Sequence, residues 1–136
     1  APQMIETMML VDKYIDQVAV VADRYKFVSA LVVPEFRLIE EWARDHDIPF
    51  TSREDLCASS KVRDMLKERI DTLQQPLANY EKIKYITLLP HHFSLESGEL
   101  TNTLKLRRAI IYKNYKELID KMYEEQPDTQ RDIASN

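Results

Sequence analysis

One lysine, at the end of an irregular segment, is the best-placed group for chemistry in this sequence. Lys105 follows residues 91–103, which show no regular periodicity and contain the chain's only glycine, Gly98. A helical pattern begins at about Arg107. Backbone amides at a helix start, together with a lysine, commonly hold a phosphate or carboxylate, and lysine acts there as a mobile point charge. An ordinary surface lysine is the alternative, and charge patterns alone favour it.

Lys105 also opens a stretch of positive charge on an acidic protein. The sequence from Thr103 to Lys116 has no acidic residue, whereas the whole chain carries a formal charge of −4. The five basic residues of this stretch are Lys105, Arg107, Arg108, Lys113 and Lys116. The contrast favours one discrete anion as the ligand over a long polyanion. Nucleic-acid binding is a weak interpretation, because the net charge opposes it.

The composition excludes several other classes of site. A single glycine cannot build the dinucleotide-binding fingerprint or a Walker-type phosphate loop, since both need several glycines. The three histidines, His46, His91 and His92, show no zinc-site spacing, and we expect no metal site. The adjacent pair His91–His92 is interpreted as a solvated turn.

The single cysteine, Cys57, excludes an internal disulfide and is typical of a reducing compartment. Arg53 lies one turn earlier, but Glu54 and Asp55 offset its field. We therefore do not expect a thiolate nucleophile at this position.

The elements that must position Lys105 can be predicted from periodicity and cap residues. The predicted helices span residues 2–14, 35–45, 52–57, 59–75 and 107–125, and the predicted strands residues 18–22, 27–33 and 82–88. The last helix is predicted to bury a stripe made of Ile111, Tyr115, Leu118 and Met122. The first two strands are expected to form an antiparallel hairpin. We predict an α+β fold with a small, mostly antiparallel sheet (this hairpin plus a third strand) packed with four to five helices.

The length of 136 residues predicts one domain, over residues 1–125, followed by a frayed tail over 126–136. No apolar run approaches the roughly 20 residues needed to span a bilayer. The chain begins with Ala1 and enters a helical pattern almost at once, so we expect it to be a piece of a longer protein.

Residues 90–108 resemble the C-terminal signature of AMP-forming long-chain fatty acid–CoA ligases, especially residues 98–101 and 103–108. These ligases belong to the adenylate-forming superfamily, with the acetyl-CoA synthetases and luciferases. Two further segments agree in the same order. Residues 1–6 resemble the segment after the family's hinge, and residues 15–33 resemble its first hairpin.

The resemblance implies a ligase of fatty acid metabolism that joins a fatty acid to ATP, giving an acyl-adenylate, and then transfers the acyl group to coenzyme A. A large N-terminal domain would hold ATP, Mg²⁺ and the acyl chain, while the small C-terminal domain swings between two poses. The family's adenylation lysine falls on Lys105. Two positions depart from the pattern, because Leu104 stands where the wider superfamily has glycine and Asn102 where the long-chain branch commonly has proline.

The resemblance also implies partners. They are the enzyme's own N-terminal domain and the substrates fatty acid, ATP and CoA, with no nucleic acid. Residues that contact coenzyme A are not assigned, although Lys82 and Lys84 are candidate phosphate partners. The isolated chain is expected to be inactive, to hold no ATP, CoA or Mg²⁺, and to self-associate through apolar surface meant for its partner domain. We expect a cytoplasmic protein, with peripheral membrane contact of the full-length enzyme as an open alternative. A second hypothesis is a non-enzymatic α+β module that binds a protein or a small ligand.

Overall fold

The computed structural model describes residues 1–22 and 25–124. Its three strands are β1 (Ile15–Val21), β2 (Val28–Pro34) and β3 (Ile83–Leu88), and its six α-helices are α1 (Pro2–Met9), α2 (Phe36–Asp45), α3 (Arg53–Ala58), α4 (Ser60–Leu73), α5 (Arg108–Asn114) and α6 (Lys116–Glu124). A 3₁₀ turn over Asn79–Glu81 precedes β3. The predicted tail, residues 126–136, lies outside the described residues, as do the first two residues of the predicted hairpin turn.

The predicted α+β class is confirmed, and the sheet has the order β1–β2–β3. β1 and β2 form the expected antiparallel hairpin, with Val20 opposite Ala30. β3 runs parallel to β2, so the sheet is mixed, with one antiparallel and one parallel pairing where we expected a mostly antiparallel one. The reason is the connection, because α2, α3 and α4 together return the chain to the end of the sheet where β2 began.

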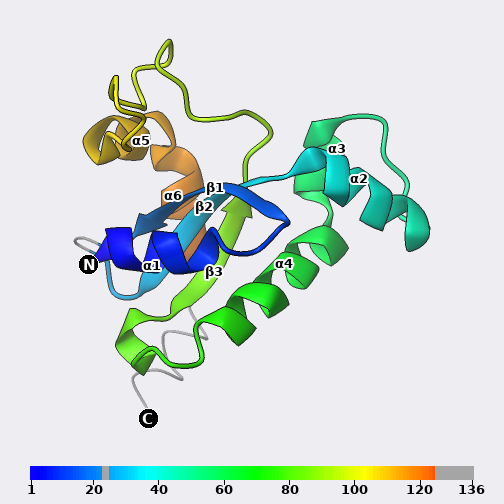
Figure 1. The fold of residues 1–136 in the computed structure, drawn as a ribbon, viewed down its shortest axis with the longest axis horizontal. Helices are drawn as coiled ribbons and strands as arrows, with labels where there is room; N and C mark the ends of the chain where they lie inside the picture. Colours follow the sequence, from blue (N-terminus) through cyan, green and yellow to red (C-terminus); the bar gives the residue numbers. More distant parts are fainter. Residues whose placement is uncertain (23–24, 125–136) are drawn as a thin grey trace.

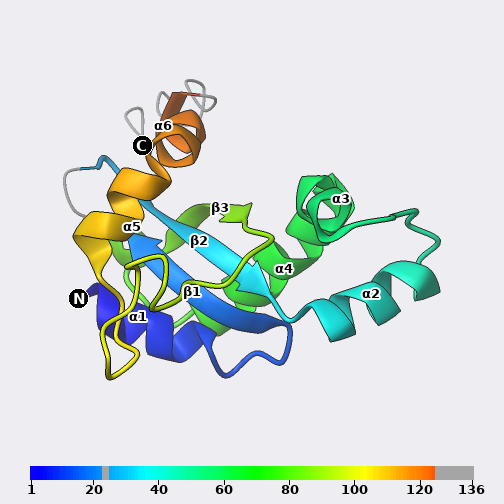
Figure 2. The ribbon, with the colours of Figure 1, turned by 90° about the horizontal axis from the view of Figure 1, so that it is seen from above.

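The central strand explains where the core lies. All seven residues of β2 are buried, as expected of a strand covered on both faces. Figures 1 and 2 show α1 and α4 against one face of the sheet and α6 against the other. No helix of the described residues is long and apolar enough to cross a membrane.

Local cap chemistry fixes the two helices between β2 and β3. The Ser52 hydroxyl accepts a hydrogen bond from the Asp55 amide at 3.1 Å, and the Ser59 hydroxyl accepts one from the Val62 amide at 3.3 Å. Both serines are therefore N-caps. The cap predicted at Ser52 is confirmed, and of the two candidates for the next helix, Ser59 and Ser60, the structure selects Ser59.

The first helix is shorter than predicted, because α1 ends at Met9 and not at Tyr14. One oxygen of Asp12 accepts the Tyr14 amide at 2.9 Å, and the other accepts Arg69 Nε at 2.7 Å. These contacts stabilise a turn over residues 10–14 in place of a further helical turn.

The last predicted helix is split in two, which brings the total to six. α5 ends at Asn114. The next residue, Tyr115, has a non-helical φ of −111° and ψ of 23°, and α6 begins at Lys116. The break rotates the second half, so Ile119 is fully buried while Leu118 is 38% exposed. The predicted stripe is thus correct at Ile111 and Met122, wrong at Leu118, and only half-buried at Tyr115.

Candidate functional site

Lys105 lies in a narrow hairpin between β3 and α5. Figure 1 shows the segment between these two elements as a long loop that extends beyond the sheet. Leu100 and Leu106 form an antiparallel bridge. On one side of this bridge the Arg107 amide donates to the Glu99 carbonyl at 2.8 Å, and on the other the Thr101 amide donates to the Lys105 carbonyl at 2.8 Å. The segment without periodicity in the sequence is therefore an ordered loop held by its own backbone.

The tip of the hairpin is closed by Thr101. Its hydroxyl accepts the Lys105 amide at 3.1 Å, and its carbonyl accepts the Leu104 amide at 2.8 Å. Leu104 has a φ of +62°, in the left-handed region that favours glycine. The backbone at Lys105 is consequently fixed on both sides of the residue.

The Lys105 side chain itself points to solvent. Lys105 is exposed, and its ammonium makes no hydrogen bond or ion pair with any of residues 1–22 and 25–124. A buried, paired ammonium would have contradicted the proposed role. Instead, the backbone of Lys105 is held by hydrogen bonds, while its ammonium is free to contact an anion outside this domain.

The base of the loop is anchored by a buried carboxylate that sequence analysis missed. Glu99 is 3% exposed. Its carboxylate accepts the Ser97 hydroxyl at 2.7 Å and Asn114 Nδ2, from the end of α5, at 3.0 Å. Burial and the contact with Glu99 raise the pKa of Tyr115. The loop is therefore tied to α5 at its base as well as closed at its tip.

A second anchor joins α5 to α1. The Arg108 guanidinium donates to both carboxylate oxygens of Glu6 at 2.6 Å each, and Glu6 also accepts the Val20 amide at 2.8 Å. The Tyr112 hydroxyl donates to the Val20 carbonyl at 2.8 Å. The bond to Glu6 is the largest cause of the raised pKa of Arg108. In the sequence, the one signal for this role is that Glu6 falls on the face of α1 that otherwise carries the apolar residues Ile5 and Met9.

These contacts correct the view of residues 103–116 as an unopposed positive stretch. Arg108 is neutralised by Glu6, and Lys116 pairs with Asp120 at 2.5 Å. The acids come from a distant helix and from the next helical turn, so the interval between Thr103 and Lys116 could not reveal them. Lys105 at the tip of the hairpin, Arg107 at its base and Lys113 on α5 remain exposed.

The other candidate groups do not form a site. His91 is exposed and lies 3.8 Å from Glu54, and His92 contacts Asp16. The described residues contain no group of three histidine, cysteine or acidic side chains placed to hold a metal ion. Burial raises the pKa of Cys57 to about 11, with Glu54 adding to the shift and Arg53 opposing it. The thiol is therefore protonated at neutral pH, in agreement with the prediction.

Comparison with known proteins gives a consistent result. Residues 1–127 match the family described as AMP-binding enzyme C-terminal domain. The chain is 30% identical over 92% of its length to long chain acyl-CoA synthetase 7, peroxisomal, of Arabidopsis thaliana. It is 31% identical over 90% of its length to human long-chain-fatty-acid--CoA ligase 1. The chain spans only 18% of the length of either relative.

Solved structures share the fold. The A-PCP didomain of carboxylic acid reductase from Segniliparus rugosus matches 96% of this chain, and the chain covers 17% of that protein, with a TM-score of 0.76 and 18% identity. The adenylation domain of the carboxylate reductase from Mycobacterium chelonae matches 90% of this chain, again with 17% of that protein covered, with a TM-score of 0.73 and 19% identity. The elements around the Lys105 loop thus follow a fold that is also found within these larger chains.

Proposed function

Because the chain belongs to the family of AMP-binding enzyme C-terminal domains, we propose that it is the mobile C-terminal domain of a long-chain fatty acid–CoA ligase. The enzyme would convert a fatty acid and ATP into acyl-adenylate and pyrophosphate, and then transfer the acyl group to coenzyme A with release of AMP. The resemblance of residues 90–108 to the ligase signature supports the substrate class. The isolated chain would be inactive, because the nucleotide-binding domain lies elsewhere in such an enzyme.

The observation that carries the proposal is the outward-pointing ammonium of Lys105 on an anchored loop. Adenylation builds negative charge on the oxygens of the carboxylate and of the α-phosphate. A lysine brought to these oxygens in one domain pose would stabilise the transition state more than the ground state. Such a group is worth about 3–4 kcal/mol, or a factor of about 10²–10³ in rate.

This domain offers a suitable residue for some of the enzyme's substrates but no cluster of ligands for Mg²⁺ among the described residues. An exposed lysine suits the anionic oxygens of ATP and of a carboxylate. The described residues offer no acidic cluster for Mg²⁺, so we assign Mg²⁺ to the N-terminal domain and derive no step from it. For coenzyme A, Lys84 is a less suitable phosphate ligand than expected, since its ammonium already donates to the Asn79 carbonyl at 2.5 Å.

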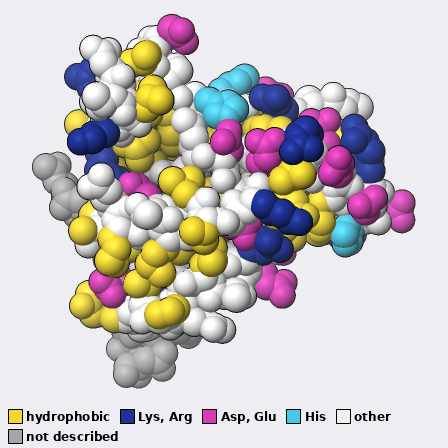
Figure 3. All heavy atoms as spheres, viewed as in Figure 1, with side chains coloured by type: hydrophobic (Ala, Val, Ile, Leu, Met, Phe, Trp, Pro, Cys, Tyr) yellow, Lys and Arg dark blue, Asp and Glu magenta, His cyan; other side chains and the backbone are white. Residues whose placement is uncertain are grey.

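The expected partner of this surface is the N-terminal domain of the same enzyme. Figure 3 shows hydrophobic side chains gathered over α1. Met4 of this helix is 46% exposed, and Leu10 and Val11, which follow it, are 47% and 73% exposed. An apolar patch of this kind indicates a contact surface. We propose that it faces the N-terminal domain, and that an isolated copy self-associates through it. We place the full-length enzyme in the cytoplasm, with peripheral membrane contact as the alternative.

The test separates the two half-reactions in the full-length enzyme. Lys105→Ala should lower acyl-adenylate formation, measured by pyrophosphate exchange, by about 10²–10³. Coenzyme A transfer from supplied acyl-adenylate should change little. Lys61→Ala, an exposed residue of α4, is the matched control and should affect neither step. Equal loss of both steps, or no loss of the first, would contradict the role given to Lys105.

A further inference from the structure

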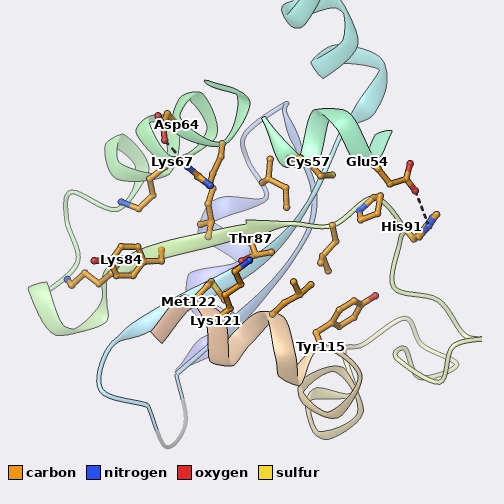
Figure 4. Close-up of a pocket in the computed structure, with 18 residues that line it drawn as sticks. Glu54, Cys57, Asp64, Lys67, Lys84, Thr87, His91, Tyr115, Lys121 and Met122 are labelled. Carbon is orange, nitrogen blue, oxygen red and sulfur yellow. Dashed lines mark ion pairs between the residues drawn. The ribbon is translucent and has the colours of Figure 1, made fainter. Parts of the chain in front are cut away.

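A groove runs along the open edge of the sheet, on the β3 side. It has a volume of about 930 Å³. Figure 4 shows β3 crossing it between α3 and α4 on one side and α6 on the other. The lining residues include a continuous run of β3 and the segment after it, residues 84–91. Neither the Lys105 loop nor the Glu6–Arg108 anchor contributes to it, so the groove is separate from the proposed catalytic surface.

The floor of the groove is a strand edge with free pairing capacity. β3 pairs with β2 on one side only. At Ile83 the buried side chain of Gln74 takes the place of a neighbouring strand, because its amide group accepts the Ile83 amide at 2.7 Å and donates to the Ile83 carbonyl at 2.9 Å. Apart from Lys121 and Tyr123, no other described residue outside β2 bonds to the backbone of residues 84–88. Within residues 1–22 and 25–124, the edge is thus capped at its first residue and has no further strand beside it.

The two walls of the groove differ in chemistry. On the α6 side, Leu118 and Met122 contribute apolar surface, Tyr115 lies beside them, and Lys121 adds one positive charge. On the α4 side, Arg63 and Lys67 contribute positive charge. Four basic and only two acidic side chains line the groove, although the whole chain is acidic. An occupant that complements both walls must carry negative charge on one face and apolar groups on the other.

The positive potential in the groove is not fully compensated. The pKa of Lys84 is lowered, first by burial and then by repulsion from Lys82 and Lys67, while Asp71 opposes the shift. Lys67 pairs with Asp71 at 2.6 Å, Arg63 Nε lies 3.9 Å from Asp64, and the Lys84 ammonium donates to Asn79. Each of these cations therefore has one partner and keeps further N–H donors for a second acceptor. An anionic group entering the groove would relieve this repulsion.

We propose that this groove binds an extended peptide segment of another protein, which pairs with β3 as a fourth strand. Side chains of a strand alternate between its two faces. The bound segment would direct acidic side chains toward Arg63 and Lys67, and apolar ones toward Leu118 and Met122. A second copy of this chain fits less well, because it would bring two basic walls together. A fatty acid would fill the apolar wall but leave the β3 backbone unpaired.

The test uses this 136-residue chain and a short peptide that alternates glutamate and valine. Binding should shift the backbone NMR signals of Ile86 and Leu88. A peptide with lysine in place of glutamate, and one N-methylated at alternate amides, should each bind at least about tenfold more weakly. The protein is the same in the experiment with the N-methylated peptide. Weaker binding of that peptide therefore reports lost strand pairing and not a misfolded protein. Equal binding of all three peptides would overturn the proposal.

Protein variants test the charged wall. Lys67→Gln should weaken binding of the acidic peptide several-fold, whereas Lys61→Gln, on the same helix but outside the groove, should leave it unchanged. Equal effects of the two variants would contradict the proposed contact. If dodecanoate displaces the peptide, the ligand of the groove is a lipid and the peptide proposal is wrong. If sedimentation shows a dimer that dissociates when the peptide binds, the partner is a second copy of this chain.

Discussion

Arg108 and Glu6 form a bidentate ion pair, although they lie 102 positions apart in the sequence. Arg108 is the first residue of α5 and follows Lys105 by three positions. Glu6 lies on α1, the helix that resembles the segment after the hinge in the ligase family. The pair therefore fixes the proposed catalytic loop to α1.

Removing the guanidinium should destabilise the domain substantially. Arg108→Ala leaves the Glu6 carboxylate buried, with the Val20 amide as its remaining partner. Losing one member of a buried ion pair costs about 3–5 kcal/mol. The Arg108 side chain is 30% exposed and that of Glu6 only 8%, so we expect about 2–3 kcal/mol. Urea unfolding of the isolated domain measures this difference.

Two variants show whether the pair itself is responsible. Arg107→Ala, at the exposed neighbouring position, should change the free energy of unfolding by less than about 0.5 kcal/mol. Glu6→Gln combined with Arg108→Ala should cost less than the sum of the single changes, because the uncompensated charge is gone. Additive effects would show that the two side chains are not energetically coupled.

Locally encoded features could be predicted from the sequence. The serine caps at Ser52 and Ser59 depend on residues three positions away, and the hairpin on a run of β-branched residues. The direction of β3 could not be predicted, because it depends on how three helices pack between strands. The break at Tyr115 also escaped prediction, since a sequence stripe assumes one unbroken helix.

The candidate site divides in the same way. The position of Lys105 on an exposed loop before a helix followed from local composition. The two carboxylates that anchor this loop did not, because Glu6 meets Arg108 only after the sheet has formed, and Glu99 reaches Asn114 only across the loop. The catalytic role of Lys105 stays a prediction until the half-reactions are measured.

Leu104 offers a way to stabilise the loop. Its left-handed φ of +62° is unfavourable for a residue with a side chain, at a cost of about 1–2 kcal/mol, and its side chain packs little because the residue is 67% exposed. Leu104→Gly removes this strain, partly offset by the greater chain entropy of glycine when unfolded. We expect a net gain of up to about 1 kcal/mol in the free energy of unfolding.

Leu104→Ala is the matched control, since it shortens the side chain but keeps the Cβ that causes the strain. Its urea midpoint should lie at or below that of the original protein. A glycine variant less stable than the alanine variant would show that the left-handed backbone at this position is not strained.

Asn114 should control the mobility of the loop more than the stability of the domain. Asn114→Ala removes the 3.0 Å hydrogen bond to the Glu99 carboxylate, which keeps the Ser97 hydroxyl at 2.7 Å. We expect a loss of about 1.5 kcal/mol, the lower end for a hydrogen bond to a charged group, because the Ser97 hydroxyl still bonds the carboxylate. Hydrogen exchange of the Arg107 amide, which donates to the Glu99 carbonyl, should accelerate. Lys113→Ala, at the exposed preceding position, should leave this exchange rate unchanged.

Cys57 should react slowly with thiol reagents in the folded domain. Burial is the main cause that raises its pKa from the ordinary 9.0 to about 11, and Glu54 adds to the shift. Because only the thiolate reacts, the folded protein at pH 8 should be alkylated about 100-fold more slowly than the urea-unfolded chain. Equal rates in the two states would show that the thiol is not shielded.

The same shift predicts a dependence of stability on alkaline pH. The folded state retains the thiol proton after the unfolded state has lost it, so the unfolded state binds fewer protons above its own pKa. The contribution of Cys57 is therefore fully present below about pH 9 and is lost progressively as the pH rises toward about 11. The free energy of unfolding of the original protein and of Cys57→Ser should be measured across this pH range. The difference between the two proteins isolates the contribution of Cys57, because the tyrosines titrate in both. The difference in stability between the two proteins should shrink from pH 9 to pH 11, and a constant difference would contradict the raised pKa.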